Sequence, residues 1–228
     1  IEESRSSFLW RSFLPKWLLL SYSFLVLLVI FQGGLGALTV LRLLPSGVVM
    51  AHLALALTLV AAMSGLSQRL LSPDGVPAPS WWRFLSGGSL FAVFVQSLIG
   101  SRMATSWAAQ KCISRGISCE WLDLHQFTAA PVTIFVLAFV FISIFVGGWP
   151  RMQWPFLLAV FILLATQISL GVFSLQLGLA QPVITVGHQL VAALLVALLS
   201  ALTFRRPDSA ETEFKESFSK TFLEQCHG

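Results

Sequence analysis

The sequence contains few charged residues. Asp, Glu, Lys and Arg make up 11% of its 228 residues, whereas soluble domains carry about 25% charged residues. Hydrophobic residues make up 56%, and the mean hydropathy is +0.83. This shortage of charge excludes an ordinary soluble domain and indicates a membrane protein.

Two other patterns are also lacking. The apolar segments do not alternate with polar residues over about ten residues, as the strands of a transmembrane barrel would. The Lys and Arg residues form no stripe interleaved with aromatic residues, so the net charge of +4 does not indicate a nucleic-acid partner. Cys226 and His227 are adjacent near the C-terminus, but a zinc site needs two more ligands at usable spacing.

Long uncharged runs dominate the chain, at residues 17–41, 43–68, 84–101, 124–150 and 152–204. About 20 apolar residues cross the hydrocarbon core as a helix, and the last run is long enough for two helices. The sequence therefore predicts an all-α, polytopic membrane bundle of six transmembrane helices built from helix hairpins. These helices are expected at residues 17–40, 48–66, 84–105, 127–146, 156–178 and 184–204.

The basic residues predict the orientation. Ten of the 14 Lys and Arg residues lie on the side of both termini, and the other four are Arg42, Arg102, Lys111 and Arg115. The positive-inside rule therefore places both termini in the cytoplasm or on its equivalent side. The tryptophans near the predicted helix ends suit an interfacial aromatic belt; they are Trp10, Trp17, Trp81, Trp82, Trp107, Trp121, Trp149 and Trp154.

A short motif recurs in three of the predicted helices. Residues 32–36, 96–100 and 167–171 all read Gln-x-x-(Leu or Ile)-Gly. Each motif is followed, at the start of the next predicted helix, by a histidine, which is His52, His125 or His188. The repeating unit is a helix hairpin, and three such hairpins indicate a bundle built by duplication.

The motif and the histidines suggest different roles. Small residues let membrane helices approach, and a Gln amide can hydrogen-bond across the interface, so packing is the favoured interpretation of the Gln and Gly positions. A single histidine could be a packing residue as well as a ligand. Three at equivalent helix starts fit cofactor ligation better, because buried imidazoles are costly. Two imidazoles on facing helices can hold a heme iron from both sides.

Two pairs of residues near the same membrane face complete the candidate site. Arg42 and Arg102 end predicted helices, where they either pair with heme propionates or extend to the interface. Cys112 and Cys119 lie in a loop outside the cytoplasm, so they are expected to form a disulfide. A free or catalytic cysteine pair is the alternative.

Several parts of the sequence together resemble the heme A synthase family. They are the motif residues at 32–40 and 96–102, the paired-cysteine loop, and the segments around His52 and His188. Cyanobacterial-type members look closest, and the resemblance runs through residues 14–204. It implies that heme O is converted to heme A for cytochrome oxidase. Members have eight helices in two similar halves, and the six helices here match the third to the eighth.

The resemblance also implies roles for the three histidines. His125 and His188 correspond to the ligands of a heme B that relays electrons. His52 corresponds to one of two histidines in the half that processes substrate heme. The implied organisation is a cytoplasmic N-terminal segment at 1–16, a first hairpin at 17–66, a heme-binding half at 84–204 and a cytoplasmic tail at 205–228. The implied location is a bacterial plasma membrane or a thylakoid membrane.

The sequence departs from the family in one respect. The family's first hairpin supplies a second histidine and a Glu-x-x-His motif, and neither occurs before His52 in this sequence. Either two helices precede Ile1 in a longer protein, which would make it an enzyme, or the chain is a reduced homologue. The reduced homologue would be a non-catalytic heme-binding or structural subunit of a respiratory or photosynthetic complex. Expected partners are membrane lipid, heme and heme O synthase or such a complex.

Overall fold

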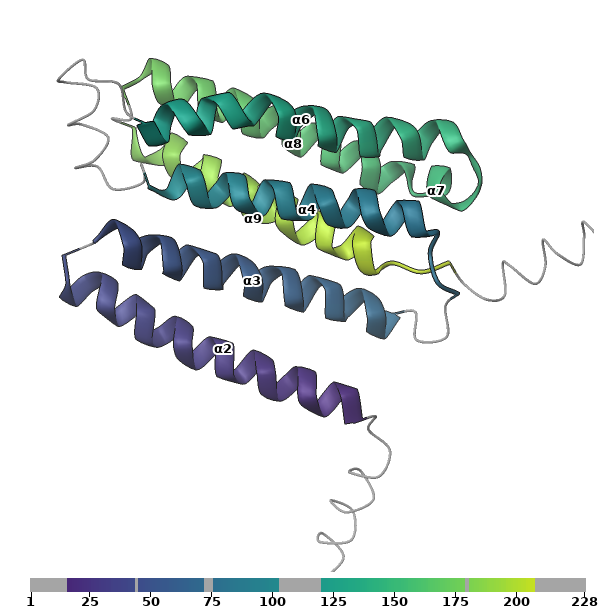
Figure 1. Cartoon of the computed structure of the whole chain (residues 1–228), viewed down its shortest axis with the longest axis horizontal. Coiled ribbons are helices and arrows are strands. Elements are labelled where there is room, and N and C mark those ends of the chain that lie inside the picture. The colour runs from purple at the N-terminus through teal and green to yellow at the C-terminus, as the bar shows by residue number, and fades with distance from the viewer. Residues whose placement is uncertain (1–15, 44, 72–75, 103–119, 179–180, 208–228) are drawn as a thin grey trace, which may run out of the picture.

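The computed structural model describes residues 16–43, 45–71, 76–102, 120–178 and 181–207. These residues form helices and no strand (Figure 1). The helices are α2 (Lys16–Leu41), α3 (Ser46–Leu71), α4 (Ser80–Ser101), α6 (Glu120–Val146), α7 (Gly148–Met152), α8 (Trp154–Gln176) and α9 (Pro182–Phe204). All except α7 are long and apolar enough to cross a membrane. The predicted bundle of six transmembrane helices is confirmed.

The helices are arranged as a hairpin beside a four-helix group. The hairpin is α2 and α3, and the group is α4, α6, α8 and α9 (Figure 1). Within the group, α4 and α8 each contact both α6 and α9, so α6 and α9 face each other across the middle. We call the end where α2, α4 and α8 finish the histidine end, because His52, His125 and His188 lie near the starts of α3, α6 and α9.

The connection from α6 to α7 depends on glycine. Gly147 and Gly148 have φ angles of 79° and 61°. A side chain strains the backbone in this left-handed region, and glycine adopts it readily. The two glycines let the chain end α6 and begin the short helix α7 at once. This helix, of only five residues, was not among the elements expected from the sequence.

An aromatic cluster fills the end of the four-helix group opposite the histidine end. Trp82 is completely buried, and its Nε1–H donates to the Leu202 carbonyl oxygen at 2.8 Å. Its ring centre lies 5.0 Å from that of Phe139 and 5.1 Å from that of Trp149, both in edge-to-face geometry. The expectation that Trp82 belongs to an interfacial belt is therefore wrong, because α4, α6, α7 and α9 enclose it.

The hairpin is fixed to the four-helix group through α3 and α9. Ser64 donates its hydroxyl to the Ala197 carbonyl oxygen at 2.7 Å, and Ser200 donates to the Ala61 carbonyl oxygen at 2.6 Å. These reciprocal bonds require the two backbones to lie close together. Gly65 permits the approach, since a Cβ there would lie 2.5 Å from the Phe204 ring. Small residues bring membrane helices together in this way.

Candidate functional site

Each repeated hairpin forms the same contact between its glutamine and its histidine. The Gln side-chain amide lies against an imidazole nitrogen of the following long helix. The amide-to-imidazole distance is 3.2 Å in all three pairs: Gln32 Nε2 to His52 Nε2, Gln96 Nε2 to His125 Nδ1, and Gln167 Nε2 to His188 Nε2. The interhelical hydrogen bonding expected of these glutamines is therefore observed, and its partner in each case is the histidine.

The glycine of each motif lies against the same imidazole ring. Residues four apart lie on one face of a helix, so the Gln amide and the Gly backbone both face the histidine. A Cβ at Gly100 would lie 2.8 Å from His125 Cε1, and one at Gly171 would lie 3.2 Å from His188 Cε1. The corresponding distance at Gly36 is 3.3 Å, to His52 Cε1. A larger residue would displace the ring, most severely at Gly100.

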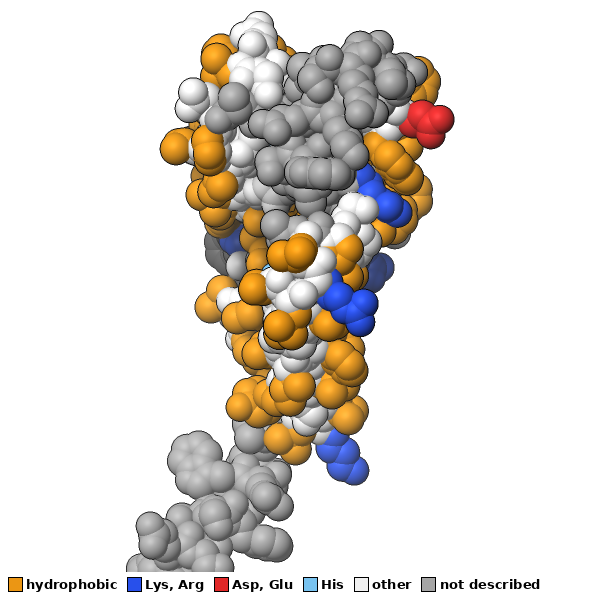
Figure 2. Space-filling view, turned by 90° about the vertical axis from the view of Figure 1, so that its left-hand side faces the viewer, with side chains coloured by type: hydrophobic (Ala, Val, Ile, Leu, Met, Phe, Trp, Pro, Cys, Tyr) orange, Lys and Arg blue, Asp and Glu red, His pale blue; other side chains and the backbone are white. Residues whose placement is uncertain are grey.

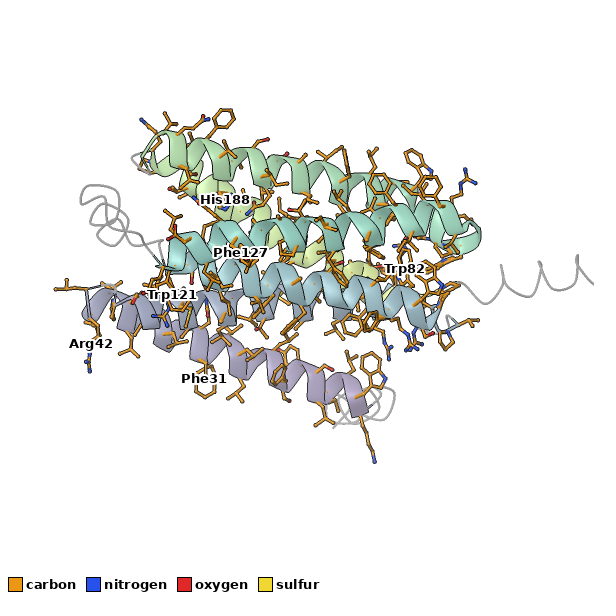
Figure 3. The ribbon with its side chains drawn as sticks, turned by 45° about the horizontal axis from the view of Figure 1, so that its top comes forward. Phe31, Arg42, Trp82, Trp121, Phe127 and His188 are labelled. Carbon is orange, nitrogen blue, oxygen red and sulfur yellow. The ribbon has the colours of Figure 1, made fainter. Side chains whose placement is uncertain are left out.

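His125 and His188 are brought together by the four-helix group, and His188 is visible near the histidine end in Figure 3. Their ring centres lie 6.5 Å apart, and their ring planes are 82° apart. An imidazole nitrogen binds a transition metal at about 2 Å, and the ring centre lies about 1 Å farther, so two axial imidazoles on one iron have centres roughly 6 Å apart. The observed separation is close to this value, and both ring nitrogens of His188 contact Gln167 of the preceding helix.

The packing of the four-helix group also changes along its length. Its large buried side chains, such as Phe139, Leu157 and Leu199, lie away from the histidine end. No residue is buried in the first part of α6 (residues 120–135) or of α9 (residues 182–191). The protein's own side chains therefore enclose the histidines less completely than they enclose the core.

His52 lies in the separate α2–α3 hairpin. Its Nε2 accepts from Gln32, while His52 Nδ1 and Gln32 Oε1 are buried atoms that have no hydrogen-bond partner among the described residues. No second histidine in the described part of the chain is paired with it by a ring contact. His52 thus shares the Gln and Gly contacts of the other two histidines, but its Nδ1 has no partner among the described residues and no imidazole opposes it there.

The two arginines proposed to bind propionates have different environments. Arg102, at the end of α4, places its guanidinium 4.7 Å from the centre of the Trp121 ring. Its Nε is buried and has no hydrogen-bond partner among the described residues. It lies two residues after Gly100, which contacts His125.

Arg42 directly follows α2 and is exposed. Figure 3 shows it pointing away from the bundle, at the same end as Trp121. Figure 2 looks onto this end, where apolar side chains cover the flanks and several Lys and Arg side chains lie among them. Only Arg102 of the pair is therefore held against the four-helix group.

The remaining candidate residues lie partly outside the described part of the chain. The cysteines Cys112, Cys119 and Cys226 lie outside the described residues, so the expected disulfide stays a prediction. Glu120 and Asp123 are exposed in the first turn of α6. No group of three or more His, Cys, Asp or Glu suited to a metal ion occurs in the part of the chain that the structure describes. A heme site differs from such sites, since its iron takes only two protein ligands.

These features define the class of protein: an integral membrane bundle of repeated hairpins, in which His52, His125 and His188 each contact a Gln amide and a Gly of the preceding helix. The chain belongs to the cytochrome oxidase assembly protein family, the family of the heme A synthases, whose sequence model matches residues 6–200. No curated protein and no solved structure matches the chain significantly. The resemblance inferred from the repeated motif is confirmed at the level of the family.

The sequence interpretation missed two residues at this site. Thr128 donates its hydroxyl toward Gln96 Oε1 at 2.7 Å, and the same hydroxyl lies 2.7 Å from the Leu124 carbonyl oxygen. Trp121 was assigned only to the interfacial belt, yet it contacts Arg102. A signal existed for Thr128, because it follows His125 by three residues and so lies on the same helix face.

Proposed function

We propose that this chain acts in heme A synthesis, oxidising heme O to heme A for cytochrome oxidase. His125 and His188 hold a heme B that relays electrons, and His52 faces the substrate porphyrin. The observation that carries the proposal is the separation of 6.5 Å between the His125 and His188 ring centres, in a member of the heme A synthase family.

The contribution of the chain's own residues is to bind and orient the cofactor. Gln96 and Gln167 fix the rotation of their histidines, and Gly100 and Gly171 leave room for the rings. Residues that orient a metal-binding histidine tune its affinity for the metal. When bound, a bis-histidine heme supplies reversible one-electron transfer.

Arg102 is the best placed group for a heme propionate. Its charge lies at the end of α4, beside the helix that carries His125, and its buried Nε is free to donate. Arginine pairs strongly with carboxylates. We propose that the histidine end faces away from the cytoplasm, as the ten-to-four distribution of basic residues predicts. Residues 17–66 would then be the substrate half and residues 84–204 the electron-relay half.

A second candidate function is supported by the surroundings of His52. Within the described residues the only acidic groups are Glu120 and Asp123, and both lie on α6 rather than on the His52 hairpin. The described part of that hairpin therefore offers one imidazole and no acid. This composition suits a heme-binding subunit of a respiratory or photosynthetic complex that carries electrons without oxidising heme O.

Absorption spectroscopy of the purified protein tests heme ligation. The expected spectrum is that of a low-spin b-type heme. Alanine at either His125 or His188 should abolish or shift it, because each removes one axial ligand. His52→Ala is the matched control and should leave this spectrum in place. An unchanged spectrum in both the His125→Ala and His188→Ala variants would contradict the ligand assignment.

Chromatography of extracted hemes separates the two candidate functions. The chain is expressed in cells that contain heme O and lack any other heme A synthase. Heme A in the extract supports the enzyme, provided that a His52→Ala variant reduces its amount. Heme B bound to the protein without any heme A supports the electron-carrying subunit.

A further inference from the structure

Arg205 links two helices at the end of the bundle opposite the histidine end. It directly follows α9, which finishes at this end (Figure 1). Its guanidinium Nη1 donates to Gln68 Oε1 of α3 at 3.2 Å. Its Cζ lies 4.4 Å from the centre of the Phe156 ring of α8. Both α3 and α8 pack against α9, so the Arg205 side chain connects the hairpin to the four-helix group across the end of α9.

The backbone next to Arg205 is also held in place. The Pro207 carbonyl oxygen accepts from the Val76 N–H at 3.0 Å. This bond ties the segment after α9 to the segment between α3 and α4. The guanidinium is therefore positioned by its neighbours on both sides. A group that is already positioned loses less conformational freedom when it binds a partner.

The positive charge of Arg205 has no acidic partner in the described part of the chain. Glu120 and Asp123 are the only acidic residues there, and both lie at the start of α6, at the histidine end. Burial lowers the pKa of Arg205, because the charged guanidinium loses water. Its bond to the neutral Gln68 side chain uses only one of several N–H donors. A partly desolvated guanidinium with further donors favours an anion.

Other exposed arginines surround this end of the bundle. Arg69 lies in the last turn of α3, Arg83 near the start of α4 and Arg151 in α7. With no described acidic residue at this end, the local charge is positive. Anionic lipids give a membrane surface a negative potential that attracts such basic groups. The charge of this end is therefore complementary to anionic lipid headgroups.

An apolar face of α9 leads from Arg205 toward the middle of the membrane. It consists of Leu194, Ala197, Ala201 and Phe204, which follow one another at steps of three or four residues and so share a helix face. Leu194 and Phe204 are 45% and 43% exposed. The helix rises about 16 Å from Leu194 to Arg205, roughly half of a hydrocarbon core of about 30 Å. This length matches an acyl chain of one leaflet.

We propose that Arg205 binds the phosphate of an anionic phospholipid, whose acyl chain lies along this apolar face of α9. The phosphate accepts from the guanidinium donors that do not face Gln68, and the chain covers Leu194 and Phe204. A soluble anion would use the charge and leave the apolar face uncovered. The inference does not depend on the proposed heme chemistry, because the site lies at the other end of the bundle.

Native mass spectrometry of the purified protein in detergent tests the site. The protein is titrated with phosphatidylglycerol and, separately, with phosphatidylcholine that has the same acyl chains. Arg205→Ala should weaken phosphatidylglycerol binding by roughly tenfold, as expected for the loss of a hydrogen bond to a charged group. It should change phosphatidylcholine binding by less than about twofold. Arg205→Lys should weaken phosphatidylglycerol binding by less than Arg205→Ala, because lysine keeps the charge without the planar donors.

Gln68→Leu tests the same site with the Arg205 charge in place. It removes the bond that positions the guanidinium, so phosphatidylglycerol binding should weaken by about twofold to fivefold. If Arg205→Ala does not fold, Gln68→Leu and Arg205→Lys still decide the question. Binding of phosphatidylglycerol that neither of them weakens would overturn the proposal.

Arg151→Ala is the matched control, because it removes the same charge from an exposed position at the same end. It should leave phosphatidylglycerol binding within about twofold of the wild type. An equal loss in Arg151→Ala and Arg205→Ala would show general attraction to the charged end and overturn a site at Arg205. Excess inorganic phosphate should not displace the lipid. If it does, Arg205 binds a soluble anion and the lipid assignment is wrong.

Discussion

Gly100 and His125 are in such close contact that a Cβ at position 100 would lie 2.8 Å from His125 Cε1. The contact joins the end of α4 to the start of α6. Because the His125 ring is also held by Gln96, the added atom would move the ring relative to His188.

We expect Gly100→Ala to weaken heme binding at least about tenfold, as the loss of residues that orient a ligand does. The measurement is the ratio of heme to protein after purification. Gly33→Ala is the control, because a Cβ at Gly33 would meet nothing within 4 Å. Equal heme content in both variants would show that the contact does not position His125.

The fold could be predicted largely from charge. An uncharged run long enough to cross a bilayer is expected to form a helix. In lipid, most other backbone structures would leave backbone groups without hydrogen bonds, which is costly. The ends of the helices were less predictable. α6 begins at Glu120, whereas the sequence predicted a start at residue 127. Hydropathy excludes Glu120 and Asp123 from a membrane span, but acidic residues are favourable in the first turn of a helix.

The position of Trp82 shows what a linear pattern cannot supply. Tryptophan near a helix end suits an interface, but burial depends on which other helices meet there. Trp82 is enclosed by Phe139, Trp149 and the carbonyl of Leu202. These residues come from three other helices, and the sequence does not specify how those helices are arranged.

The candidate site could be predicted in part. The repeated motif identified His52, His125 and His188 together, but residue spacing alone does not say which two face each other. The helix order around the four-helix group decides this, since α6 and α9 face each other between α4 and α8. Gln and Gly are four residues apart in each motif and so lie on one helix face. This spacing could have predicted that both residues contact the histidine.

The contact between Gly65 and Phe204 should control how firmly the α2–α3 hairpin is attached. Gly65→Ala would place a Cβ 2.5 Å from the Phe204 ring, and overpacking of this kind costs about 1–3 kcal/mol. We expect a lower midpoint of thermal unfolding in detergent. Adding Phe204→Leu should recover part of the loss, because it removes the clashing ring.

Gly47→Ala is the control for this stability measurement, since a Cβ at Gly47 would meet nothing within 4 Å. The double-mutant cycle measures the coupling between positions 65 and 204 directly. Additive effects of Gly65→Ala and Phe204→Leu would show that the two residues do not restrict each other.

The disulfide expected between Cys112 and Cys119 can be tested by thiol labelling. Protein unfolded without reductant should be labelled at Cys226 alone, because a disulfide blocks the other two thiols. Prior reduction should expose all three cysteines and serves as the control. Labelling at three positions in the unreduced sample would show that the cysteine pair is free.

The two arginines of the candidate site should contribute unequally to heme retention. Arg102 is held against Trp121 and has a buried, unpartnered Nε within the described residues, whereas Arg42 is exposed. A hydrogen bond to a charged group contributes about 1.5–3 kcal/mol. We therefore expect Arg102→Ala to speed the transfer of heme to excess apomyoglobin by roughly tenfold or more. Arg42→Ala should change this rate by less than about twofold.

Trp121→Leu distinguishes a positioned Arg102 from one that only extends to the membrane interface. Without the ring, Arg102 keeps its charge but loses a cation–π contact of about 0.5–1 kcal/mol at an exposed site. Heme transfer should then be faster than in the wild type and slower than in Arg102→Ala. Arg102→Lys should also release heme faster, because lysine lacks the planar set of donors that pairs with a carboxylate. If Arg102→Ala retains heme as well as Arg42→Ala does, neither arginine binds a propionate and both serve the interface instead.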